Sequence, residues 1–117
     1  MEDCIFCKII KGEVPSNKVY EDEYVYAFYD INPAAKIHIL VIPKKHINSL
    51  AELSEEDEKY VWSIHKAINK IAKDKGFDKS GYRVIVNCGK DAGQEVLHLH
   101  FHVLAGAKFG DKIVSTK

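Results

Sequence analysis

The chain has 117 residues, 46% of them hydrophobic, which fits one compact domain with a single core. Its 17 Lys and Arg balance 17 Asp and Glu without long blocks of one sign, which argues against binding a nucleic-acid polymer or an anionic membrane. No apolar run approaches the ~20 residues that cross a bilayer, and no secretion signal is visible at the start. We therefore expect a single domain over residues 1–117 in a cytoplasmic protein that binds a small molecule.

The first half of the chain predicts a short helix and then a β-hairpin. Residues 5–10 form a short helical segment, and residues 19–20 count as a strand although they are too brief to assign by themselves. Residues 24–29 and 37–42 are rich in β-branched and aromatic side chains, and the turn-forming residues 30–33 separate them. These two segments are predicted to pair as antiparallel strands.

The second half predicts one long helix and two further strands. Residues 54–57 have the form of a capping box, and apolar residues then recur at steps of three and four until Gly76. Residues 82–87 and 97–104 read as strands joined by a glycine-containing loop. The order β-β-β-α-β-β predicts an α+β fold with an antiparallel five-stranded sheet, one long helix and one short helix.

Three histidines alternate with apolar residues in the last predicted strand, His98-Leu99-His100-Phe101-His102. Strand geometry sends the imidazoles to one face and the apolar side chains to the core. Neighbours on one face lie roughly 6.6 Å apart, so one phosphate group could meet more than one ring. Two other interpretations stay open at this point: a chance row of surface histidines, and a transition-metal site built from all three.

Four segments in the same order resemble the histidine triad (HIT) superfamily. They are residues 4–10, 28–33, 38–46 and the alternating motif at 98–104, and the similarity extends to about Gly106. Within the superfamily the chain most resembles the histidine triad nucleotide-binding branch. That resemblance implies a HIT-like fold, a homodimer, and cleavage of purine nucleoside phosphoramidates or acyl-nucleotides, with AMP or GMP derivatives as ligands.

The resemblance also implies a role for each site residue. His100 would attack the α-phosphorus and form a covalent nucleotidyl-histidine, while its second ring nitrogen donates to a backbone carbonyl. His102 and His38 would bind phosphate oxygens and help to move a proton to the leaving group, and His98 completes the catalytic set. The implied nucleotide-binding residues are Ile9, Phe28, Asp30, Ile31, Leu40, Asn87, Gly93, Gln94 and Glu95.

Plainer interpretations exist for part of this set. Asp30 would accept hydrogen bonds from both ribose hydroxyls, but it could also form an Asx turn before Pro33. The apolar members would form a slot for the base, although core membership alone would explain them. Glu95 stands where the best-known members carry a serine, and an ionised carboxylate would repel a phosphate, so the preferred leaving group stays open.

Cys4 and Cys7 have the Cys-x-x-Cys spacing of metal sites, and in a reducing cytosol such a pair is more often a metal or redox site than a disulfide. No compact histidine pair follows to complete the site by spacing alone. The resemblance implies that His46 and His98 complete a structural zinc site with four protein ligands. No organic cofactor is expected.

Three other functions stay open. The first is a dinucleoside polyphosphate hydrolase of the same superfamily, which would use the same His100. The second is a nucleotide-binding adaptor without catalysis, and the third is a metallochaperone that uses the thiols and histidines.

Overall fold

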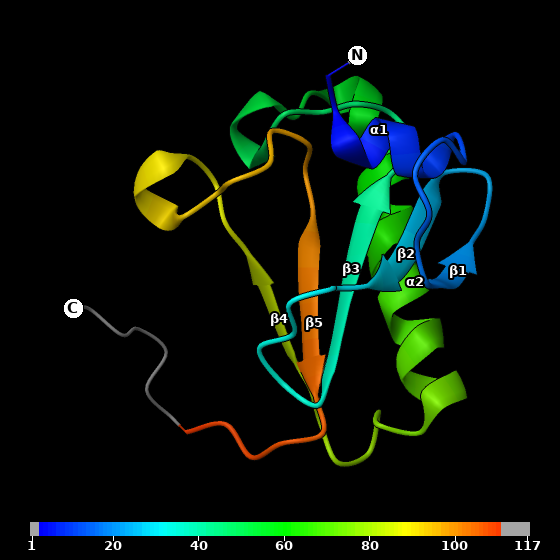
Figure 1. Cartoon of the computed structure of the whole chain (residues 1–117), viewed down its shortest axis with the longest axis vertical. Helices are drawn as coiled ribbons and strands as arrows, with labels where there is room; N and C mark the ends of the chain where they lie inside the picture. Colours follow the sequence, from blue (N-terminus) through cyan, green and yellow to red (C-terminus); the bar gives the residue numbers. More distant parts are fainter. Residues whose placement is uncertain (1–2, 111–117) are drawn as a thin grey trace.

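The structure is a computed structural model that describes residues 3–110. Five antiparallel strands form one sheet in the order β1-β2-β3-β5-β4, with α1 on one face and α2 on the other (Figure 1). This confirms the predicted α+β fold. The ends of the predicted domain, residues 1–2 and 111–117, lie outside the described residues. The elements are α1 (Ile5–Ile10), β1 (Lys18–Glu21), β2 (Val25–Tyr29), β3 (Ile37–Pro43), α2 (Glu58–Lys75), β4 (Arg83–Val86) and β5 (Phe101–Ala105).

Alternate residues of the central strands face different helices. In β2 and β3, Ala27 and Val41 belong to the core cluster beneath α2, whereas Phe28 and Leu40 pack against α1. Both faces of the sheet are therefore covered, which explains why β2 and β3 read as continuous apolar runs. Within residues 3–110, no helix is long and apolar enough to cross a membrane.

The long helix begins later than the sequence predicts. The capping box at Ser54 is present, but it starts a short 3-10 turn, Glu55–Asp57, and α2 follows at Glu58. The buried Asp57 carboxylate accepts hydrogen bonds from the Ser54 backbone at 3.0 Å and from Lys45 Nζ at 2.5 Å. Since Lys45 follows β3, this ion pair ties the end of that strand to the start of α2.

The last strand is shorter than predicted, and this corrects the placement of two histidines. The sequence predicts a strand over residues 97–104, whereas β5 covers Phe101–Ala105, so His98 and His100 precede it. Val41 pairs with Phe101, which brings Pro43 opposite Leu99. Proline has no N–H to donate, so the ladder between β3 and β5 ends there. β4 is likewise shorter than the predicted 82–87, and the uncertain strand at 19–20 belongs to β1.

Candidate active site

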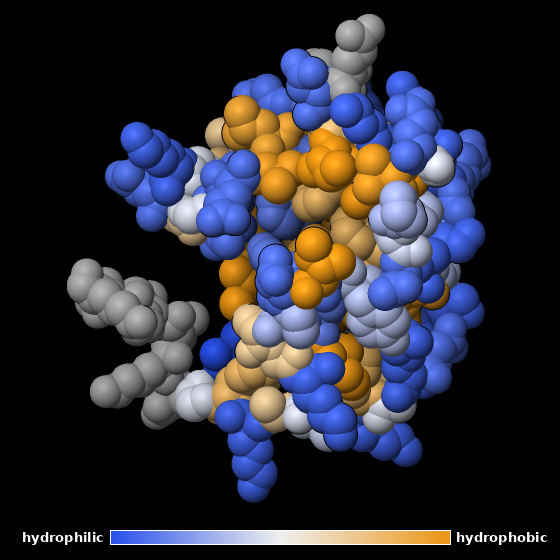
Figure 2. Space-filling model, viewed as in Figure 1, coloured by the Kyte–Doolittle hydropathy of each residue, from blue (hydrophilic) through white to orange (hydrophobic). Residues whose placement is uncertain are grey.

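A cavity of about 420 Å³ lies on the α1 face of the sheet, and this volume is typical of small-molecule pockets. Figure 2 shows hydrophobic surface gathered in the upper half of the view, where Figure 1 places α1. Apolar side chains from α1, β2 and β3 meet polar ones from β5 and the loop before it. The predicted site residues that line the cavity are Ile9, Phe28, Asp30, Ile31, Leu40, Asn87, Gly93, Glu95, His100 and His102.

His100 is buried, and one of its ring nitrogens is committed to the backbone. Its Nδ1 lies 2.8 Å from the carbonyl oxygen of His98. A carbonyl can only accept, so Nδ1 carries a hydrogen, and in the neutral form of the ring Nε2 is the nitrogen with the lone pair. The ring of Phe6 packs edge-on against His100, with ring centroids 5.2 Å apart. The hydrogen bond therefore orients the His100 ring and leaves Nε2 as the ring nitrogen without a partner in the backbone.

His38 and His102 form a hydrogen-bonded pair across β3 and β5. The backbone N–H of Ala34 donates to His38 Nδ1 at 3.0 Å, so the proton of the neutral ring is on Nε2. That Nε2–H donates to His102 Nδ1 at 2.9 Å, and Asp30 Oδ2 lies 3.5 Å from the same nitrogen. The neutral His102 ring consequently carries its own hydrogen on Nε2. His102 offers a donor while His100, with ring centroids 5.0 Å away, offers a lone pair.

Burial keeps this pair uncharged at pH 7. Desolvation, reinforced by the neighbouring His100 and His38, lowers the pKa of His102 from 6.5 to about 4. Desolvation also lowers the pKa of His38, and the nearby Asp30 carboxylate only partly opposes that shift. In the ligand-free protein both rings are therefore neutral and act through hydrogen bonds.

Two metal alternatives can be tested on this geometry. Asp30, His38 and His102 lie close enough together to hold an ion. The Ala34 hydrogen bond opposes this, since it places the proton on His38 Nε2 and removes the lone pair that a metal would need. Among the described residues, no candidate metal cluster contains His98, His100 and His102 together. The three alternating histidines therefore divide between different tasks.

Asp30 also makes the Asx turn that the sequence left open. Its Oδ1 accepts the backbone N–H of Asn32 at 2.8 Å, while Oδ2 faces His38. Ile31, the next residue, is 88% exposed at the cavity and is not part of the core. A ligand that covered Ile31 would bury apolar surface that the protein alone leaves in water.

Gln94 differs from the other predicted nucleotide residues, because its side chain is used to brace a loop. Its Nε2 donates to the carbonyls of Asn48 at 2.7 Å and Val96 at 3.0 Å, and its Oε1 accepts from the Gly89 backbone at 2.9 Å. Gln94 does not line the cavity. Its place in the structure is to hold the segment that carries Gly93 and Glu95.

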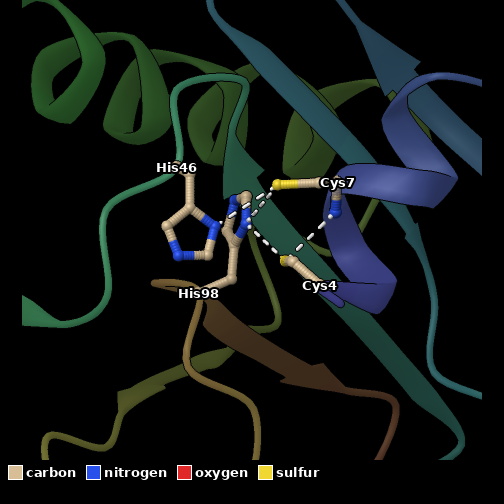
Figure 3. A group of neighbouring side chains, drawn as sticks. All are labelled: Cys4, Cys7, His46 and His98. Atoms are coloured by element: carbon tan, nitrogen blue, oxygen red, sulfur yellow. Dashed lines mark hydrogen bonds between the residues drawn. The ribbon is translucent and has the colours of Figure 1, made fainter. Parts of the chain in front are cut away.

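Two cysteines and two histidines form a second cluster of side chains (Figure 3). His98 Nδ1 lies 3.2 Å from Cys4 Sγ and 3.5 Å from Cys7 Sγ, and His46 Nδ1 lies 3.3 Å from Cys7 Sγ. All four donor atoms lie within 4.8 Å of one another. The start of α1, the loop after β3 and the segment before β5 thus converge on one point.

The second nitrogen of each histidine in this cluster is held by an oxygen. His98 Nε2 donates to the Pro43 carbonyl at 2.9 Å, and His46 Nε2 donates to Asn48 Oδ1 at 2.7 Å. Both Nδ1 lone pairs consequently face the thiols, as in histidines that bind metals. Burial raises the pKa of Cys7 to about 11 and lowers that of His98 to about 4. Two sulfurs and two imidazoles are a donor set that fits tetrahedral zinc.

Sequence reasoning missed the central position of Phe6. Its ring packs edge-on against His98 and His100, with centroids 5.8 and 5.2 Å away, and against Phe28 at 5.6 Å. Phe6 therefore separates the cysteine–histidine cluster from the cavity that it also lines. The sequence did indicate this position, because Phe6 lies three residues before Ile9 and so shares with it one face of the predicted helix.

Known proteins resemble this chain over almost its full length. A model of the HIT domain family matches residues 11–109. A histidine triad protein from Clostridium difficile is 58% identical, with a TM-score of 0.93 over 97% of this chain and 98% of that one. A HIT family hydrolase from Clostridium thermocellum is 54% identical, with a TM-score of 0.95 over 97% and 99%. A histidine triad nucleotide-binding protein from Candida albicans is 37% identical, with a TM-score of 0.81 over 98% and 87%.

Proposed function

The chain belongs to the HIT domain family, and from this premise we propose that it hydrolyses purine nucleoside 5′-phosphoramidates or acyl-nucleotides through a covalent nucleotidyl-His100. One observation carries the proposal: the His100 Nε2 lone pair and the His102 Nε2–H belong to adjacent rings that line the same cavity. The likeness to a HIT family hydrolase and to a histidine triad nucleotide-binding protein supports it.

In the first step, His100 Nε2 would attack the α-phosphorus of the bound nucleotide. The bond from phosphorus to the leaving nitrogen or oxygen breaks, and its electron pair stays with the leaving group. The His100 ring becomes positively charged, and the His98 carbonyl that accepts from Nδ1 at 2.8 Å stabilises this charge. The leaving group then needs a proton.

The His38–His102 pair would supply that proton. An anionic phosphoryl group next to His102 favours the protonated form of the pair, because opposite charges raise the pKa of an imidazole. His102 would pass a proton to the leaving atom, and the pair would return to its neutral form with one hydrogen on each ring. In the second step, water attacks phosphorus, the bond to Nε2 breaks, and the pair takes up a proton from the water.

The nucleoside would occupy the apolar part of the cavity. Phe28 and Leu40 lie on the α1 face of the sheet, and Ile9 approaches from the helix above them. These side chains offer surface on which a purine ring can pack. Asp30 would meet the ribose, although both of its oxygens already have a partner in the protein.

We further propose that Cys4, Cys7, His46 and His98 hold a structural zinc ion. Bound zinc would supply a rigid tetrahedral link between three segments that are far apart in sequence. With four protein ligands, no position stays open for substrate. Since the two cysteines would act as thiolates, a reducing compartment such as the cytoplasm suits this protein.

We also propose that the chain forms a homodimer. β4 is an edge strand, and Val84, which pairs with Val103 and so lies on the α2 face, is 39% exposed. Trp62 on α2 is 62% exposed. A second copy that covered this side would bury both residues and would pair an open strand edge.

Hydrolysis of adenosine 5′-phosphoramidate tests the proposed reaction. We expect release of AMP and ammonia, with an acid-labile nucleotide on His100 in a rapid quench. Diadenosine polyphosphates serve as the competing substrate. Faster turnover of the dinucleotides would instead favour the dinucleoside polyphosphate hydrolase, and tight AMP binding without any turnover would favour the nucleotide-binding adaptor.

A further inference from the structure

A second cavity of about 510 Å³ adjoins the first one. Ile5, Glu95 and Val96 line both cavities, so these residues form a shared wall. The far side of the second cavity includes Asp3 and Leu97. None of the steps described above uses this space.

The groups that face the second cavity have a distinct chemistry. Ile5 is 42% exposed and Leu97 is 63% exposed, so both offer apolar surface to an occupant. Asp3 and Glu95 are exposed carboxylates, and no Lys or Arg among the described residues lines the cavity. The His46 ring and the Asn48 side chain also line this cavity, but they are hydrogen-bonded to each other, because His46 Nε2 donates to Asn48 Oδ1. The groups left to contact an occupant are therefore the apolar side chains of Ile5 and Leu97 and two negatively charged carboxylates.

Glu95 is the only charged residue among the three that line both cavities. It lines the same cavity as His100 and His102, and its carboxylate would repel the phosphoryl group of a bound nucleotide. A positive charge on the substrate near Glu95 would offset that repulsion. A group attached to the phosphorus reaches the second cavity by passing this residue.

The geometry points to the second cavity as a subsite for the leaving group, one that selects an amine with an apolar stem and a second, cationic end. The inference rests on the proposed phosphoramidate hydrolysis. The scissile bond is still the one between phosphorus and nitrogen, and the distal ammonium takes no part in the reaction. Its apolar stem would cover Ile5 and Leu97, and its charge would lie near Glu95 and Asp3.

Three adenosine phosphoramidates of matched length test this selectivity. Their amines are hexane-1,6-diamine, hexylamine and 6-aminohexanoic acid, which end in an ammonium, a methyl and a carboxylate. We expect kcat/KM to be about fivefold higher for the ammonium than for the methyl, as for an exposed ion pair, and lowest for the carboxylate. The preference should shrink as salt is added, because ions screen exposed charges.

Glu95→Gln removes the charge and keeps the size of the side chain. In this variant the preference for the ammonium substrate over the methyl substrate should fall strongly, and Asp3→Asn should lower it in part. The combined variant should react with both substrates at equal kcat/KM. Glu23→Gln is the matched control, because Glu23 is exposed and lines neither cavity, and it should keep the wild-type ratio. An unchanged ratio in Glu95→Gln would overturn the inference.

A binding experiment separates this inference from the proposed reaction. If none of the three compounds is hydrolysed, the proposed function fails, and hexylammonium and hexanol are then titrated while the methyl resonances of Ile5 and Leu97 are followed by NMR. Tighter binding of hexylammonium, weakened in Glu95→Gln, supports a cation-selective site. Equal binding of both probes, or none, refutes it.

Discussion

The backbone carbonyl of His98 accepts the Nδ1–H of His100 at 2.8 Å, while the ring of the same His98 faces Cys4 and Cys7 at 3.2 and 3.5 Å. One residue thus serves the proposed zinc site through its side chain and the proposed nucleophile through its main chain. Phe6, which packs against both rings, closes the space between them. The geometry of His100 therefore depends on the segment that the cysteines hold.

His100→Ala should abolish covalent catalysis. The loss of turnover is expected to reach several orders of magnitude, up to roughly 10⁶-fold, as for other enzymes that lose their nucleophile. AMP affinity, measured by calorimetry, should change little, because Phe28 and Leu40 still offer their surface to the base. Near-normal turnover, or a nucleotide adduct on His38 or His102, would show that the assignment is wrong.

Zinc should be bound at about one equivalent for each chain. Cys4→Ser combined with Cys7→Ser should release it and lower the melting temperature, because the cluster joins α1 to two distant segments. Turnover should fall less than in His98→Ala, which removes a ligand beside His100. Cys88→Ser is the control, since Cys88 is exposed and outside the cluster, and it should keep its metal. Purified protein without metal and with an unchanged melting temperature would contradict the site.

The stability of the fold should fall as the pH drops from 6.5 towards 4. His102 has an ordinary pKa of 6.5 when unfolded and one of about 4 when folded, so the unfolded chain binds more protons in this window. Burial of the His102 ring is the main cause of this lowered pKa, His100 and His38 add to it, and the Asp30 carboxylate opposes it.

His102→Gln isolates this contribution to stability. Urea unfolding at steps between pH 7 and pH 4 should give a shallower decline of the unfolding free energy in the variant than in the wild type. Groups that do not contact position 102 titrate equally in both proteins, so the difference between the two curves reports on His102 and on the neighbouring rings coupled to it. Parallel curves would mean that the folded protein does not depress the pKa of His102.

Val84→Glu should turn a dimer into a monomer. The substitution places a charge on the exposed edge strand, where a paired copy would bury it. Sedimentation at micromolar concentration measures the mass directly. Ile31→Glu, which places a charge at a more exposed apolar residue beside the first cavity, should leave the dimer intact. A wild-type monomer at that concentration would rule out the proposed assembly.

Local patterns in the sequence were sufficient for most of the architecture. Steps of three and four residues located α2 because its buried side chains must share one helix face, and Gly76 ended it in a left-handed conformation. The alternation around His100 correctly put Leu99, Phe101 and Val103 in the core. The same alternation predicted a strand that begins too early. The strand is shortened by Pro43, which lacks an N–H, and Pro43 belongs to a neighbouring strand that the local pattern does not include.

Long-range contacts decided the chemistry of each histidine. Alternation treats His98, His100 and His102 as equivalent, and the sequence motif does not show which atom each ring nitrogen meets. Folding brings the Pro43 carbonyl to His98, the His98 carbonyl to His100, and His38 to His102. Those partners place the protons, and the protons determine which ring nitrogen keeps a lone pair toward the cysteines, which keeps one toward the cavity, and which donates a hydrogen bond.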